Sequence, residues 1–201
     1  MRKYLRPSSV ISSESNLKES VNIEDLELAR LCARGDENAR KEMYIRYAGS
    51  LYAICIRYVG DRELARDLMH DSMIRIYDTI GKYRPTGTLK SWMSKVTVNL
   101  LIDHIRRERK YQFVSMEGEY EKIPEPSVEE MRTVPKDQIM RMVSELPEAK
   151  RVIFNLFCVE GYSHKDISVM LGIKEKTSSS LLFKAREQLS RNVREYLREN
   201  G

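Results

Sequence analysis

The sequence has little of what metal binding, disulfide bonding or membrane insertion needs. Its 201 residues include 3 cysteines, 3 histidines and 1 tryptophan, and no two cysteines form a Cys-x-x-Cys pair. An odd number of widely spaced cysteines argues against a disulfide framework and against a zinc site, and it fits the reducing cytoplasm. No run of about 18 apolar residues occurs, so we expect no insertion into a membrane. The basic N-terminus has no apolar core after it and is not read as a secretory signal.

The residue constellations that carry catalysis are also missing. The sequence has no nucleophile–base pair, no glycine-rich phosphate loop and no paired carboxylates with an evident role. We therefore expect no enzyme activity, no catalytic residues, no cofactor and no metal. Charge is abundant, because 32% of the residues are charged against about 25% in typical domains. The net charge of +5 suits an acidic partner such as nucleic acid.

Apolar residues recur at steps of three and four from Ile23 to about Lys110 and again after Lys136, which predicts helices throughout. Asp36 and Asp61 are the expected N-caps of two of these helices. No strand-like alternation is long enough to trust. The predicted fold is all-α, with two small helical domains joined by a flexible linker.

Composition divides the chain into four parts. Residues 1–24 are rich in serine and charge, so we expect a flexible N-terminal extension. Residues 25–110 form the first helical domain. Residues 111–135 hold three prolines and six glutamates without a helical period, and are too long for a comfortable loop, so they are the acidic linker. Residues 136–201 form the second helical domain.

The second domain contains a predicted helix-turn-helix between Ser163 and Leu189. Ser163 is the expected N-cap of its first helix, Gly172 supplies the tight turn, and the second helix begins near Lys174 and ends at Leu189. Four apolar residues are expected to form the buried face of the first helix: Ile167, Val169, Met170 and Leu171. The second helix carries small hydroxyls and lysines, which donate to phosphates and fit against base edges. Its candidate DNA-binding residues are Lys176, Thr177, Ser179, Ser180, Phe183 and Lys184.

The first domain has a basic helix from Leu89 to about Arg109. An apolar stripe through Val98, Leu101, Ile102 and Ile105 is expected to be core. A second stripe, at steps of three and four, can contact phosphates and read a base edge. Its members are Lys95, Asn99, Asp103, Arg106 and Lys110. Either this stripe binds nucleic acid or it is an ordinary solvated face.

The preceding helix, residues 61–80, is acidic instead. It carries five acids against three arginines. An acidic helix beside a basic one indicates two different partners, a nucleic acid and a protein with a basic surface. The loop between the two helices, residues 81–88, is predicted from its glycines and proline.

Together these segments resemble an extracytoplasmic-function (ECF) sigma factor of the sigma-70 family. Residues 63–77 are similar to the family's Ala-x-Asp-Leu-x-Gln-x-x-Phe helix. Residues 83–107, with Trp92, Asn99 and Asp103, are similar to its Trp-Leu-x-x-Ile-Ala-x-Asn-x-x-x-Asp-x-x-Arg-Arg signature. The resemblance also includes Leu146-Pro147 and the helix-turn-helix. The linker is not similar in sequence, but it occupies the same position between the two domains as the linker of the family.

The resemblance implies a promoter-recognition subunit that binds core RNA polymerase, directs it to promoters and helps to melt the minus-ten element. Asp67, Leu68 and Asp71 fall on the helix that docks on the polymerase clamp coiled coil. The loop that captures a flipped minus-ten base corresponds to residues 82–88, with candidate contacts from Lys82, Tyr83, Arg84 and Thr88. The basic stripe falls on the helix that lies against the minus-ten element, and the helix-turn-helix on the minus-thirty-five element.

The resemblance also implies further partners. These are the polymerase flap, the RNA exit path for the acidic linker, and an anti-sigma factor that restrains the chain. The sequence departs from the family in the recognition helix, where a common lysine is Ser179 and a common arginine is Leu181. Fewer cations there should weaken phosphate contacts and change base preference. A common glutamine of the acidic helix is His70, which is read as an ordinary surface histidine.

Two other function classes stay open at this point. A stand-alone helix-turn-helix regulator with a helical sensing or dimerisation domain would not need residues 81–107. A nucleic-acid-processing enzyme would need an acidic cluster beside a histidine or cysteine, and none is present in the sequence.

Overall fold

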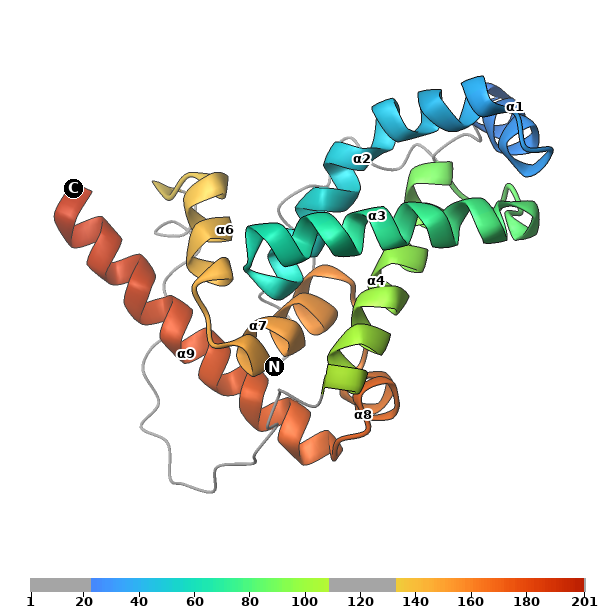
Figure 1. The fold of residues 1–201 in the computed structure, drawn as a ribbon. Coiled ribbons are helices and arrows are strands. Elements are labelled where there is room, and N and C mark those ends of the chain that lie inside the picture. The colour runs from blue at the N-terminus through green and yellow to red at the C-terminus, as the bar shows by residue number, and fades with distance from the viewer. Residues whose placement is uncertain (1–22, 109–132, 201) are drawn as a thin grey trace. The chain divides into compact units, whose positions relative to one another are not determined.

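The computed structural model describes residues 23–108 and 133–200, and in these ranges all regular structure is helical (Figure 1). The all-α prediction is therefore confirmed for the described residues. They fall into two compact units, and the chain passes from the first to the second between His104 and Ile105. Residues 1–22 of the predicted N-terminal extension and 111–132 of the predicted linker lie outside the described residues, whereas Ile23 and Glu24 already belong to a helix. The three domain boundaries stay predictions. No helix among the described residues is long and apolar enough to cross a membrane.

Four α-helices and a short 3-10 helix make up the first unit. Helix α1 packs against α2, α3 and η1, and α2 packs along α3. The elements are α1 (Ile23–Ala33), α2 (Glu37–Val59), α3 (Arg62–Thr79), η1 (Ile80–Lys82) and α4 (Leu89–Glu108), of which α4 continues past the unit boundary.

Both predicted N-caps of this unit are confirmed. The carboxylate of Asp36 accepts a hydrogen bond from the backbone N–H of Ala39 at 2.8 Å, and Asp61 accepts from that of Leu64 at 2.8 Å. Each satisfies one of the backbone donors that a helix leaves unpaired at its start. The helix boundaries follow from these two aspartates.

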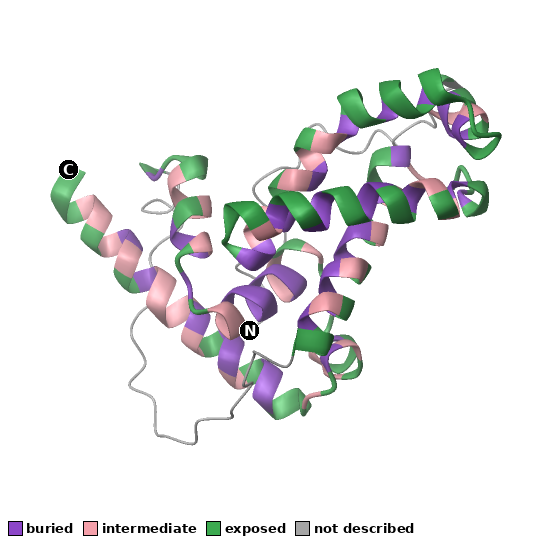
Figure 2. Cartoon of the chain, in the orientation of Figure 1, coloured by how far each residue is buried: buried purple, intermediate pink, exposed green. Residues whose placement is uncertain are grey.

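The predicted apolar stripes form the core of the first unit (Figure 2). Met43, Leu51 and Tyr58 of α2 are fully buried, as is Ile76 of α3. Each stripe lies on the side of its helix that faces the neighbouring helices, which is the amphipathic arrangement that small helical domains need.

The second unit holds the helix-turn-helix. Its elements are α6 (Lys136–Ser144), α7 (Glu148–Phe154), the single π-helical turn η2 (Asn155–Val159), α8 (His164–Leu171) and α9 (Glu175–Asn200). Helices α6, α7 and α8 all pack against α9. The turn between α8 and α9 passes through Gly172 at φ +68°, a left-handed conformation that glycine adopts without strain. The predicted turn glycine is confirmed.

The second helix of this motif is longer than the sequence predicted, because α9 runs to Asn200 instead of ending at Leu189. Its last turns have a packing partner in α6. Buried Val193 and half-buried Tyr196 of α9 join Met142 and Val134 in a small separate cluster. Burial of this apolar stripe keeps the helix intact well past Leu189.

One core prediction for α8 was wrong. Val169 is 76% exposed, whereas Ile167 and Leu171 are buried as expected and Met170 is half-buried. Successive residues of an α-helix are 100° apart around its axis. Val169 is two residues from both Ile167 and Leu171, so it lies on the opposite side of the helix from them. A helix of two turns that packs through one narrow stripe leaves that side in solvent.

A buried hydrogen bond ties α1 to α2. The Tyr47 hydroxyl donates to Asp25 Oδ1 at 2.7 Å, and the Asp25 side chain is only 13% exposed. We expect Tyr47→Phe to lower the free energy of unfolding by about 1–3 kcal/mol, because Asp25 loses a hydrogen bond to its charged carboxylate and, among the described residues, keeps only the pairing with Arg46 at 3.2 Å. Urea unfolding followed by circular dichroism measures this change.

The matched control is Tyr52→Phe, a half-buried tyrosine on the same helix, which should change stability by less than about 0.5 kcal/mol. Burial, then the Asp25 hydrogen bond, raises the pKa of Tyr47 to about 12. This stabilisation is complete below about pH 10 and is lost as the pH rises through 12. Equal losses in both variants, or an unchanged alkaline limb in Tyr47→Phe, would contradict the assignment.

Candidate nucleic-acid interface

Helix α4 carries two stripes of different character, about 100° apart around the helix axis. Val98, Leu101, Ile102 and Ile105 are buried, which confirms the predicted core stripe. The other predicted stripe is exposed along its described length, and its described members are Lys95, Asn99, Asp103 and Arg106. Lys110 lies outside the described residues. The exposed stripe combines cations that can pair with phosphates and an amide that can pair with a base edge.

The loop before α4 is held by its own side chains. The Tyr83 hydroxyl donates to the carbonyl of Gly87 at 2.8 Å, and its ring lies 5.8 Å from that of Trp92, centroid to centroid. Thr88 Oγ1 accepts from the backbone N–H of Ser91 at 3.1 Å and so serves as the N-cap of α4. Tyr83 is buried and Thr88 half-buried, so both shape the loop from within.

Two cations of the same loop stand outside it. Lys82 and Arg84 are exposed. The Arg84 guanidinium donates to the carbonyls of Gly81 at 3.3 Å and Tyr83 at 3.2 Å, which holds it close to the loop backbone. An anionic ligand over this loop would meet these two side chains first.

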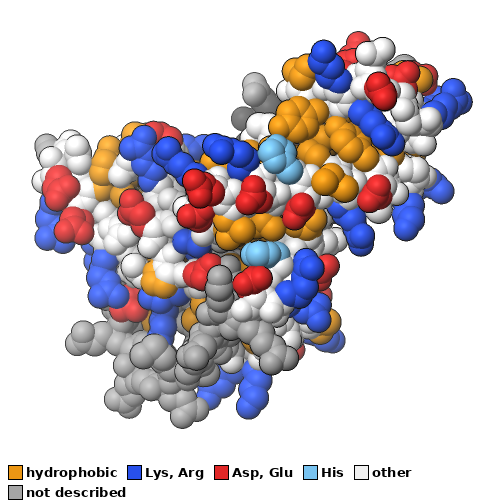
Figure 3. All heavy atoms as spheres, viewed as in Figure 1, with side chains coloured by type: hydrophobic (Ala, Val, Ile, Leu, Met, Phe, Trp, Pro, Cys, Tyr) orange, Lys and Arg blue, Asp and Glu red, His pale blue; other side chains and the backbone are white. Residues whose placement is uncertain are grey.

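The acidic helix α3 has a different surface. Asp67 and Asp71 are exposed, whereas Leu68 is buried in the core of the unit. Beside them, Tyr44 of α2 and His70 of α3 stack and share a hydrogen bond at 3.2 Å. Ile74 is 60% exposed in the same helix. Figure 3 shows hydrophobic side chains gathered on the face formed by α2 and α3.

Sequence reasoning did not single out Tyr44 or Ile74. Both lie off the buried stripes of their helices, and an isolated apolar residue on a helix surface is common. What sets these two residues apart is their position beside the acidic residues of α3. This position follows from the packing of α2 against α3, which the sequence alone does not give.

The helix-turn-helix is fixed at its first turn by a capping box. Asp166 accepts from the backbone N–H of Ser163 at 3.1 Å while the Ser163 hydroxyl accepts from that of Asp166 at 3.1 Å. The hydrogen bonds from Ser163 lower the pKa of the Asp166 carboxyl. The predicted N-cap at Ser163 is confirmed.

A histidine connects the two helices of the motif. His164 Nδ1 and Ser178 Oγ lie 2.9 Å apart, and the ring stacks on Phe157 with centroids 4.4 Å apart. Burial, followed by the charge of Arg186, lowers the pKa of His164, which favours the neutral form of the ring. Arg186 in turn lies over the Phe157 ring at 5.9 Å. These contacts set the orientation of α9 relative to α8.

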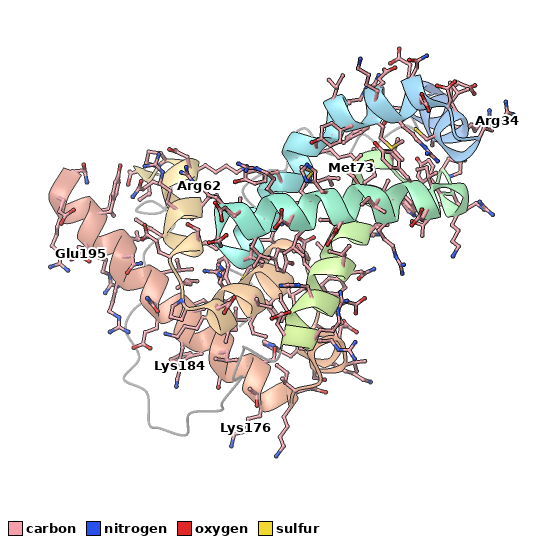
Figure 4. All side chains as sticks on the ribbon, in the orientation of Figure 1. Arg34, Arg62, Met73, Lys176, Lys184 and Glu195 are labelled. Carbon is pink, nitrogen blue, oxygen red and sulfur yellow. The ribbon has the colours of Figure 1, made fainter. Side chains whose placement is uncertain are left out.

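The predicted DNA-facing residues of α9 differ in exposure. Lys176 and Ser179 are exposed, Phe183 is 38% exposed, and Ser180 and Lys184 are half-buried. Thr177 is only 5% exposed and packs in the unit's core with Ser178. Figure 4 shows Lys176 and Lys184 extending outward from α9, about two turns apart. The helix therefore offers hydroxyls and a ring at its surface, with lysines on either side in sequence.

No metal centre is found in the described ranges, where no group of three or more histidine, cysteine, aspartate or glutamate side chains could hold an ion. The exposed side chains of the two units can recognise a partner through charge, hydrogen bonds and apolar contacts.

Comparison with known proteins places both units. The family model for Sigma-70 region 2 matches residues 43–111, and the model for Sigma-70 region 4 matches residues 136–189. Together they cover more than half of the chain, and they occur in the order in which the two units are arranged.

Similar individual proteins agree with this. The chain is 27% identical to "ECF RNA polymerase sigma factor SigE" of Mycolicibacterium smegmatis over 84% of this chain and 66% of that protein. It is 24% identical to "RNA polymerase sigma-H factor" of Pseudomonas aeruginosa over 88% of this chain and 97% of that protein.

Among solved structures, the chain matches a co-crystal structure of the sigma factor RpoE in complex with the anti-sigma factor NepR from Bartonella quintana. The sequence identity is 18%, the match covers 75% of this chain and 94% of the matched chain, and the TM-score is 0.43.

Region 2 and region 4 matches on two helical units, with an exposed basic stripe on one and a helix-turn-helix on the other, lead to one conclusion. The chain belongs to the sigma-70 family as an ECF sigma factor, a non-enzymatic initiation factor that directs RNA polymerase to promoters.

Proposed function

We propose that this sigma factor contacts its promoters at two places, the minus-ten element through α4 and the loop before it, and the minus-thirty-five element through α9. The single observation that carries the proposal is the exposed stripe of α4, which runs beside a buried one. In this proposal the domains are residues 25–110 and 136–201, joined by the linker 111–135.

On α4, Lys95 and Arg106 pair with phosphates, and Asn99 and Asp103 hydrogen-bond to the bases between them. An amide offers both a donor and an acceptor, and a carboxylate accepts from exocyclic amino groups. Base edges are fully available only when the strands have separated, so these contacts favour the melted element. Lys110 would extend the stripe by one more cation.

The loop before α4 holds a base that has left the stack. Lys82 and Arg84 form its cationic rim, while Tyr83 and Thr88 give it shape from inside. A preformed loop lowers the cost of capture, because little of it has to be ordered when the base binds. Unstacking costs a few kcal/mol, which contacts in the loop must offset.

On α9, the surface of Lys176, Ser179, Ser180, Phe183 and Lys184 enters the major groove. Hydroxyls can pair with any base edge, and an exposed ring can contact a thymine methyl. Thr177 is buried and supports this surface from behind. Because cations are few here, base preference depends on close contacts more than on charge.

The acidic surface of α3 is the docking site for core RNA polymerase. Asp67 and Asp71 face the clamp coiled coil, with buried Leu68 positioning the helix beneath them. Tyr44 and Ile74 add apolar contact at the same place. The second unit binds the polymerase flap, an anti-sigma factor restrains the chain, and the protein acts in the cytoplasm.

Transcription from a promoter library with purified core polymerase tests the proposal. Start sites that depend on the chain should share one sequence near minus ten and another near minus thirty-five. Tight binding of the chain alone to duplex DNA without new starts would instead support a stand-alone regulator.

Asn99→Ala should abolish open-complex formation and leave the affinity for core polymerase unchanged, because Asn99 lies on the exposed stripe of α4 and supports no other helix. Permanganate reactivity of unpaired thymines measures opening. Asn38→Ala, at an exposed asparagine of α2, is the matched control and should open promoters normally. Loss of both activities together in Asn99→Ala would contradict this division.

Asp67→Arg should weaken binding to core polymerase at least tenfold, or about 1.4 kcal/mol, because it reverses a charge at the centre of the docking surface. Fluorescence titration with core enzyme measures the affinity, and circular dichroism should show an unchanged fold. Glu199→Arg, a charge reversal at the exposed end of α9, should bind normally. An unchanged affinity of Asp67→Arg would place the docking surface elsewhere.

A further inference from the structure

Helices α7 and α9 bring three cationic side chains together, and two of them, Lys150 and Arg191, lie outside the surface described above. Lys150 of α7 donates from Nζ to Gln188 Oε1 on α9 at 2.9 Å. Lys184, Gln188 and Arg191 are spaced by four and three residues, which puts them on one face of α9. The hydrogen bond therefore places Lys150 beside this face. Its partner Gln188 lies between Lys184 and Arg191 in the sequence of α9. We call Lys150, Lys184 and Arg191 the basic cluster.

Positive charge dominates this cluster. Burial lowers the pKa of Lys150, and the charges of Lys184 and Arg191 lower it further. Glu187 acts in the opposite direction with the weaker effect, and its carboxylate lies 3.7 Å from the Arg191 guanidinium. Like charges held this close disfavour one another, and an anion bound among them would remove that cost. The cluster is thus arranged for an anionic partner.

The length of α9 indicates which anion this is. A helix of 26 residues is about 39 Å long, whereas the major groove is about 12 Å wide. Only the first turns can lie among base edges when Lys176 and Ser179 enter the groove. Arg191 is roughly 18 Å further along the axis than Ser179, so it lies outside the groove. The anionic groups of the duplex at the edge of the groove are the phosphates of its backbone.

We propose that the basic cluster binds phosphates of the promoter duplex beside the minus-thirty-five element, independently of sequence. Lys150 and Arg191 are then DNA-contacting residues in addition to Lys184. This inference rests on the proposed function of α9, and it adds a second kind of contact to it. The first turns of α9 determine the base sequence, and the basic cluster supplies affinity and register.

Salt dependence tests the inference, because each phosphate contact contributes about 0.9 to the slope of log affinity against log salt. The measurement uses reconstituted holoenzyme and a promoter taken from the library. Lys150→Gln and Arg191→Gln should each reduce the slope by about 0.9. Between 50 and 200 mM salt the wild type should then lose about 3.5-fold more affinity than either variant.

Base preference at the minus-thirty-five element should stay unchanged in both variants. Lys150→Arg keeps the charge and should keep the wild-type slope, which separates loss of charge from loss of packing. Lys136→Gln removes an exposed cation from α6 and is the matched control. It should leave the slope unaltered. Circular dichroism of each variant confirms that it folds.

The outcomes are distinct. Unchanged slopes in both glutamine variants, while the wild type still binds through its minus-thirty-five element, would overturn the phosphate contact alone. A fall in affinity for core polymerase in place of the slope change would assign the basic cluster to a protein surface and also overturn it. Absence of minus-thirty-five-dependent binding in the wild type would instead mark failure of the proposed function itself.

Discussion

Each helix in units this small has to supply both the core and a binding surface, and this double demand determines where the functional residues lie. Helix α4 carries one buried and one exposed stripe. Val98 and Ile102 belong to the buried stripe, and Lys95 and Asn99 to the exposed one. Packing of the first stripe fixes the rotation of the helix, and that rotation decides which side chains reach a partner. In the proposed binding mode, recognition by α4 therefore depends directly on core packing.

The helix-turn-helix meets the same demand with polar contacts. Its first helix has only two turns and buries a narrow stripe, so packing alone fixes its rotation weakly. The capping box at Ser163 and the contact of His164 with Ser178 supply additional restraints. Burial and then the charge of Arg186 lower the pKa of His164, so both disfavour a charged ring at this position. The turn at Gly172 then fixes the direction in which α9 leaves.

Helix caps and stripes could be predicted from the sequence because they depend on residues close together in the chain. Asp36, Asp61, Ser163 and Gly172 each act within one helical turn, and all four were placed correctly. The end of α9 could not be predicted, because its last turns depend on α6, more than 40 residues earlier. For the same reason, the sequence did not predict the burial of Tyr83 and Thr177 or the hydrogen bond between Lys150 and α9. These features depend on tertiary packing, which the periodicity of apolar residues does not indicate.

The distribution of charge along α9 connects the departures from the family pattern with the basic cluster. Where relatives commonly carry a lysine and an arginine, this chain has the exposed hydroxyl of Ser179 and the buried Leu181. The start of the helix therefore has fewer cations that could contact phosphates. In the proposed binding mode, Lys150, Lys184 and Arg191 supply cations further along the helix. Affinity and base reading would then be separated along one helix, so that the first turns could differ in base preference without loss of the electrostatic contacts.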